Sequence, residues 1–170
     1  MAAVITHRDL YIDIRRYLIK TLGISAEDEK QVIQAYQNSN PLPADAVVMT
    51  ILFERPIDST FVNYKKANEQ KAIVQQAREA TVQLDFYGSL AQTRSQKIAL
   101  LWKTSYSLRE LKKCAPLYTK EPRRIPIVNE QNNYEDRWSL DCLLQYDPEV
   151  EHEQDYITEP PTISLTNLNP

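Results

Sequence analysis

The stretch QKAIVQQAREATVQLDFYGSLAQTRSQKIALLW, residues 70–102, changes its pattern of apolar residues halfway along. Up to Phe86 the side chains alternate with a period of two, which is typical of a strand, and the later half of this strand has one apolar face. After Gly88 the apolar residues recur at a spacing of three to four, which is typical of an amphipathic helix. The stretch therefore predicts a strand, a sharp turn and a helix over residues 89–103.

The turn between these two elements consists of Asp85, Phe86, Tyr87 and Gly88, which we name the corner. The chain has two glycines, and Gly88 supplies the permissive backbone that a change from strand to helix requires. Asp85 and Tyr87 could be taken for a catalytic pair, but residues at a strand end more often hydrogen-bond to the turn that contains them. We therefore interpret the corner as structural.

The first half of the strand, from residue 72, is polar on both faces and belongs to an extended polar stretch over residues 65–79. Because it has no face to bury, we expect it to leave the main sheet as an extended ribbon that contacts solvent or another subunit. Its Ala, Glu, Gln and Lys residues make a helix over residues 66–80 the alternative. We favour the strand because no break separates this segment from the strand that follows it.

The N-terminal segment predicts a helix over residues 7–22. Thr6 and Asp9 form an approximate capping box before it, and apolar residues then follow at helical spacing. Gly23 occupies the position at which helices commonly end.

Two strands and three connections are expected between this helix and the ribbon. Residues 32–36 predict a short strand, and residues 46–54 predict a strongly apolar strand that is central to the sheet. The connections 24–31 and 37–43 are expected to be loops or turns, since they are polar or contain prolines. Residues 56–70 are less regular and are expected to be a crossing loop or the end of a hairpin.

The C-terminal half predicts mostly strands. Ser107 is expected to cap a short helix over residues 108–113. The proline-containing residues 117–131 are expected to hold at most two short strands. Residues 134–146 alternate with an almost continuous apolar face, which predicts a long strand.

A final strand is expected over residues 149–156, and it carries four acids on one face. These acids are Glu149, Glu151, Glu153 and Asp155. The plain interpretation is a solvated edge strand that its charges keep soluble. The residues that follow, 159–170, have no core of their own and are expected to extend outward or onto a neighbouring subunit.

These elements predict one α+β domain over residues 1–158, followed by an extended tail over residues 159–170. The domain is expected to contain a mixed, mostly antiparallel sheet, covered by two main helices, with an extended β ribbon. The core should combine both helices with alternate residues of the two long strands. Its expected members are Ile14, Leu18, Val82, Leu84, Phe86, Leu101, Trp102, Trp138, Leu140 and Leu144.

Composition excludes several classes of protein. The chain of 170 residues carries a net charge of −3, which gives no electrostatic support for coating nucleic acid. No apolar run approaches the ~20 residues of a membrane span. The N-terminus lacks the basic and apolar regions of a signal peptide, so we expect a protein made in a reducing cytoplasm.

The sequence also predicts no enzyme, no cofactor and no metal site. Two glycines cannot form a glycine-rich phosphate loop, and no hydrolase or metalloprotease motif occurs. The only cysteines and histidines lack the close spacing of metal ligands. They are Cys114, Cys142, His7 and His152.

The segments VIQAYQNSNPLP, VVMTILFE, VQLDFYGSLAQ and DRWSLDCLLQYD, in this order, resemble the neck and tail-terminator proteins of tailed bacteriophages. In that family a strand that ends in D-F-Y-G precedes a helix whose start is rich in small residues, and a late strand carries an aromatic residue. Here these features correspond to the corner, to Ser89-Leu90-Ala91 and to Arg137-Trp138. The resemblance covers residues 11–156.

The resemblance implies a ring, commonly a homohexamer, that closes the tail tube and joins it to the head-completion or connector proteins. It implies a place in the neck of the virion, after assembly in the host cytoplasm. DNA would pass through the ring without specific binding, so the acidic face of residues 149–156 would line the channel and repel phosphates. The corner would reverse the chain, with Phe86 and Tyr87 anchored in the core, and the ribbon would reach a neighbour in the ring.

A second class of function remains open on the sequence alone. The chain could be a small cellular adaptor that binds a peptide by adding it as a strand to the exposed ribbon.

Overall fold

The computed structural model of the chain describes residues 4–36, 42–64, 71–128 and 134–153. Its helical elements are α1 (His7–Leu22), the 3-10 helix η1 (Ala26–Gln31), α2 (Ala91–Trp102) and α3 (Ser105–Glu110). Its strands are β1 (Val32–Gln34), β2 (Val47–Pro56), β3 (Phe61–Tyr64), β4 (Lys71–Gln75), β5 (Arg78–Tyr87), β6 (Ala115–Thr119), β7 (Arg123–Arg124), β8 (Ile127–Val128), β9 (Tyr134–Glu135), β10 (Arg137–Tyr146) and β11 (Glu149–Glu153).

The main sheet has six strands in the order β1-β2-β5-β10-β6, with β7 also paired to β10. β1 pairs with β2 in parallel, and the other pairs in this sheet are antiparallel. A second sheet of three strands has the order β11-β4-β3, and β8 pairs with β9 in a separate ribbon. The predicted α+β class with a mixed, mostly antiparallel sheet is confirmed.

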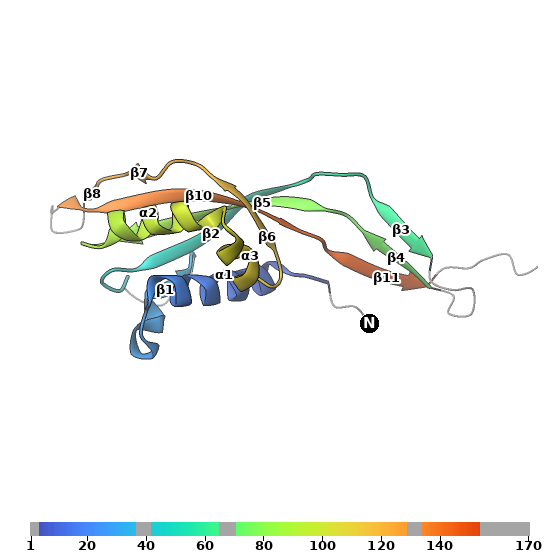
Figure 1. The fold of residues 1–170 in the computed structure, drawn as a ribbon, viewed down its shortest axis with the longest axis horizontal. Coiled ribbons are helices and arrows are strands. Elements are labelled where there is room, and N and C mark those ends of the chain that lie inside the picture. The colour runs from blue at the N-terminus through green and yellow to red at the C-terminus, as the bar shows by residue number, and fades with distance from the viewer. Residues whose placement is uncertain (1–3, 37–41, 65–70, 129–133, 154–170) are drawn as a thin grey trace, which may run out of the picture.

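Both main helices bury their apolar residues against one face of the main sheet (Figure 1). Leu10, Ile14 and Leu18 of α1 and Ile98 and Trp102 of α2 belong to the same buried cluster. From the sheet this cluster takes the alternate residues of β5 and β10: Ala80, Val82, Leu84, Phe86, Leu140, Cys142 and Leu144. The face assigned to these two strands from their alternation is therefore confirmed.

Two members of the predicted core are only half-buried. Leu101 is only half-buried and lies outside the cluster, because α2 turns Ile98 and Trp102 toward the sheet instead. Trp138 is also half-buried, although it packs against the edge of the cluster. It lies near the start of β10, opposite Phe86 of β5 and Arg124 of β7.

Helix α1 has the predicted bounds and the predicted caps. The Thr6 hydroxyl accepts a hydrogen bond from the Asp9 backbone N–H, and the Asp9 carboxylate accepts one from the Thr6 N–H at 2.8 Å. The Thr6 hydroxyl also donates to the Asp9 carboxylate at 2.6 Å, and this bond, together with the backbone one, holds the pKa of Asp9 below its ordinary value. Gly23 ends the helix with φ of 69°, a left-handed conformation that glycine adopts without strain.

The main strands β2, β5 and β10 continue, beyond three breaks, into the strands β3, β4 and β11 of the second sheet. The breaks are residues 57–60, 76–77 and 147–148. Figure 1 shows the result, an arm of three strands that extends away from the helix-covered body. The predicted ribbon therefore exists, and within residues 71–80 the alternative helix is not formed.

Several local predictions were wrong. Residues 26–31 form a 3-10 helix rather than a loop. Of the two alternatives for residues 56–70, the hairpin fits the structure, because residues 61–64 form the strand β3, which pairs antiparallel with β4 of the arm. Residues 115–128 hold three short strands, not two at most. The strand expected over residues 46–54 to be central to the sheet is β2, but only part of it has a neighbour on both sides. β1 pairs with it only at Val47–Met49. Beyond a bulge after Ile51 its Leu52 and Phe53 side chains are exposed.

The third helix begins earlier than predicted. Its N-cap position is Thr104, so Ser107 lies inside α3 and does not cap it. Ser107 is fully buried instead, where its hydroxyl shares a hydrogen bond of 2.7 Å with the Tyr17 hydroxyl. Burial raises the pKa of Tyr17. This contact fixes α3 against α1.

Candidate assembly interface

The corner joins β5 to α2 through a tight backbone contact. Gly88 has φ of 83°, and the Tyr87 N–H donates to the Ala46 carbonyl at 2.9 Å. A Cβ atom on Gly88 would lie 2.2 Å from Asp45 Oδ1 and 3.1 Å from Asp45 Cα. Glycine is therefore required at this position both by its backbone conformation and by its neighbour.

The other corner residues lie on two opposite faces of the sheet. Phe86 is fully buried in the core, as predicted. Tyr87 follows the other parity and is half-buried, with the Arg137 guanidinium 5.8 Å from its ring centroid. The expectation that Tyr87 anchors the core is therefore wrong, because a strand turns successive side chains to opposite faces.

Asp85 is buried on the same face as Tyr87. Its carboxylate accepts hydrogen bonds from Arg137 Nη2 at 2.7 Å and from Gln83 Nε2 at 3.0 Å. Burial opposes the charge of Arg137, but the hydrogen bond and the negative charge of Asp85 raise its pKa overall. These contacts tie β5 to β10 and give Asp85 a structural role.

Two further buried carboxylates continue this polar face of the sheet. Asp141, on β10, is 4% exposed and pairs with Lys120 at 3.0 Å and with Arg123 at 3.3 Å. Glu79, on β5, pairs with Arg55 of β2 at 2.8 Å. This set of ion pairs could not be recognised from the sequence. Its only local signal is the presence of acids at alternate positions of strands that are otherwise apolar.

The arm has one apolar and one acidic face. In its register Val62, Val74 and Val150 lie directly opposite one another, so they share a face, and Tyr64 and Ala72 lie on that face too. Ala72 is fully buried, whereas Tyr64 is 69% exposed. No helix covers this apolar face within the residues that the structure describes.

Three of the four candidate channel acids occupy the other face of the arm. Glu149, Glu151 and Glu153 alternate along β11, as predicted, and Asp155 lies outside the described residues. The three carboxylates are not equally accessible to solvent, because the Glu151 side chain is 10% exposed and binds Lys71 at 2.7 Å. Glu153 is exposed and Glu149 is half-buried.

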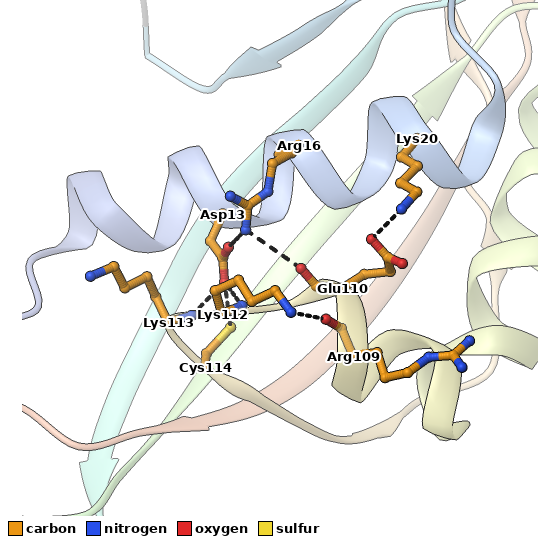
Figure 2. Close-up of polar contacts among 8 residues, drawn as sticks. All are labelled: Asp13, Arg16, Lys20, Arg109, Glu110, Lys112, Lys113 and Cys114. Atoms are coloured by element: carbon orange, nitrogen blue, oxygen red, sulfur yellow. Dashed lines mark hydrogen bonds and ion pairs between the residues drawn. The ribbon is translucent and has the colours of Figure 1, made fainter.

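A buried carboxylate in the body fixes the connection between α3 and β6 (Figure 2). Asp13 of α1 is 2% exposed, and its Oδ2 atom accepts hydrogen bonds of 2.7 Å from the backbone N–H groups of Lys112 and Lys113. Its Oδ1 atom pairs with Arg16. Beside it, burial raises the pKa of the Cys114 thiol to about 12.

Among the described residues, no group of three His, Cys, Asp or Glu side chains is placed to hold a metal ion. His7 binds Glu54 at 2.7 Å, and His152 lies on the arm, whereas Cys142 is buried in the core of the body. None of the helices in the described part is long and apolar enough to cross a membrane.

Comparison with known proteins identifies the family of the chain. A family model described as phage neck terminator protein matches residues 8–167 of the chain. This match includes the body, the arm strands and most of the C-terminal tail. A search of curated proteins found no match. Since the family match spans nearly the whole sequence, the chain belongs to the phage neck terminator protein family.

Proposed function

We propose that the protein forms a closed ring, commonly of six copies in proteins of this kind, at the junction of head and tail. The ring caps the tail tube and joins it to the head-completion or connector protein. Family membership supports a structural role in the phage neck. It also favours this role over a cellular adaptor and over an enzyme.

The observation that carries the ring proposal is the arm. A three-stranded sheet that projects from the body, with an uncovered apolar face, leaves apolar side chains in water in a single copy. Among them, Tyr64 is 69% exposed and Val150 is 49% exposed. Contact with a neighbouring copy would remove this surface from water, and a contact between unlike surfaces that repeats around an axis closes a ring.

The acidic face of the arm is proposed to border the channel through which DNA passes. Carboxylates repel phosphates, so such a lining keeps DNA contacts weak and passage fast. The exposed position of Glu153 supports this arrangement. The ion pair between Glu151 and Lys71 reduces the negative charge that Glu151 presents to the channel. The virion neck would be the final location of the ring, after its assembly in the host cytoplasm.

The channel proposal is tested with Glu149→Lys and Glu153→Lys, and Glu151 is left unchanged because a lysine there would face Lys71. The variant should fold and assemble like the parent, yet the particles should eject their DNA more slowly or incompletely. The matched control is Glu149→Gln with Glu153→Gln, which removes charge without reversing it. Lysine particles that eject DNA like the parent would leave these acids a role in solubility alone.

The ring itself is tested by native mass spectrometry and negative-stain images of the purified chain, alone and with tail tubes. Closed rings of one fixed subunit number are expected. A chain that stays monomeric under both conditions, while it binds peptides by strand addition, would favour the adaptor function instead.

A further inference from the structure

The strand β3 is an exposed edge of the arm. It pairs with β4 on one side, and in the described part of the chain no strand lies on its other side. All four of its residues are exposed, including the large side chains of Phe61 and Tyr64. An edge of this kind presents backbone N–H and C=O groups to which another strand can bind.

The two edges of the arm differ in their protection. The opposite edge, β11, carries Glu149, Glu151 and Glu153, and charges of this kind discourage unwanted pairing. The sequence of β3, FVNY, contains neither a charge nor a proline. The structure therefore leaves β3 open to an added strand, while it protects β11.

The C-terminal tail has the sequence of a strand that could fill this edge. Residues 160–170, PPTISLTNLNP, carry no charge, and Ile163 and Leu165 alternate with Thr162, Ser164 and Thr166. A strand with this pattern has one apolar and one polar face, like the arm itself. The family match extends to residue 167, so this segment belongs to the pattern that the family shares.

We propose that residues 162–168 of one copy add as a strand to the free edge of β3 in a second copy. Ile163 and Leu165 then extend the apolar row of Val62, Val74 and Val150, and the hydroxyl side chains join the polar face. The tail follows β11, on the opposite edge of the arm from β3, and β11 runs outward to the arm's end (Figure 1). Residues 154–161 span at most about 28 Å when extended, and the paired prolines 160 and 161 favour such a conformation.

This contact deepens the proposed function, since each copy gives one strand and receives one, which is the head-to-tail arrangement that closes a ring. Neighbouring copies are then joined through residues 162–168 of one copy and the edge strand β3 of the next. The full-length chain is the material for every test.

The first test replaces Ile163 and Leu165 by aspartate. The matched control places aspartate at Thr162 and Ser164, which adds the same charge on the other face of the strand. Analytical ultracentrifugation over a range of concentrations should show that the first variant needs about tenfold more protein, or more, to assemble halfway. The control should assemble nearly as the parent does. Equal assembly by the parent and both variants would overturn the inference.

The second test mixes a Val62→Cys chain with a Leu165→Cys chain and oxidises the mixture. A disulfide-linked dimer that contains one chain of each kind is expected, and it should be more abundant than the dimers that either chain forms with itself. The native Cys142 is fully buried and the Cys114 thiol has a raised pKa, so neither should compete. A Val150→Cys chain replaces Val62→Cys as the control, because it lies on the protected edge.

The two tests separate this inference from the proposed function. If rings form on tail tubes but the tail variants assemble normally and no mixed dimer appears, the strand exchange is wrong and the ring stands. If no mixed dimer appears and a single chain that carries both Val62→Cys and Leu165→Cys forms a disulfide within itself, the tail binds its own β3 and the exchange between copies is wrong. If no ring forms at all, the proposed function fails.

Discussion

Replacement of Gly88 by alanine should destabilise the protein through a clash that the structure locates. Alanine at φ of 83° costs about 1–2 kcal/mol in conformational energy alone. Its Cβ atom would also lie 2.2 Å from Asp45 Oδ1, so the Asp45 side chain must move. We expect a total loss of about 2–4 kcal/mol in the free energy of unfolding.

Gly23 provides a matched control for this substitution. It also has a positive φ, 69°, but a Cβ atom there meets nothing within 4 Å. Gly23→Ala should therefore cost only the conformational part, about 1–2 kcal/mol. The difference between the two variants measures the contact with Asp45.

A double-mutant cycle with Asp45→Gly completes the experiment. Asp45 has φ of 54°, so glycine fits its backbone, and its removal should recover about 1 kcal/mol or more of the Gly88→Ala loss. Urea unfolding followed by tryptophan fluorescence supplies the free energies. Gly88→Ala that is no more destabilising than Gly23→Ala, or that is not relieved by Asp45→Gly, would refute the reasoning.

Three further predictions concern buried side chains. Asp13→Asn should lower the free energy of unfolding by about 1.5–3 kcal/mol, because two backbone donors lose a charged acceptor; an unchanged urea midpoint would contradict this. Cys114, with its pKa raised from 9.0 to about 12, should react with a disulfide reagent at pH 8 far more slowly in the folded protein than in urea. The stability that its buried neutral thiol contributes should be lost as the pH rises from 9 to 12. An ordinary rate in the folded protein would count against that burial. Trp102→Ala should cost about 3–5 kcal/mol and Trp138→Ala clearly less, since only Trp102 is fully buried and donates to a backbone carbonyl; the reverse order in urea unfolding would show that the burial is misassigned.

Elements whose signals are local could be predicted from the sequence. The helix α1 carries its cap, its apolar spacing and its terminal glycine within residues 6–23, and all three were identified. The long alternating runs of β5 and β10 determine which residues face the core. The corner was found because a positive φ at Gly88 requires a residue type that is rare in this chain.

Features that depend on distant contacts could not be predicted in the same way. The Asp13 carboxylate binds backbone groups about a hundred residues further along, and nothing near position 13 indicates them. The strand β3 has only four residues between polar segments, and it is a strand because β4 pairs with it. The break between β4 and β5 carries no glycine or proline, so alternation alone suggested one continuous strand.

The candidate channel acids show the same limit. Alternation placed Glu149, Glu151 and Glu153 on one face of a strand, and the structure has them there. It could not show that Lys71 lies beside Glu151, because that neighbour comes from a strand 80 residues earlier. Which face of the arm borders a channel depends on the arrangement of several copies, and it stays a proposal.

The central claim, that this chain caps the tail tube as a ring, is tested most directly on tubes that lack it. Tail tubes from a phage deleted for this gene would be incubated with the purified chain and imaged by negative-stain electron microscopy. We expect one added ring at a single end of each tube, and tubes that then join to heads. Tubes whose ends stay bare, with a folded chain present in excess, would contradict it.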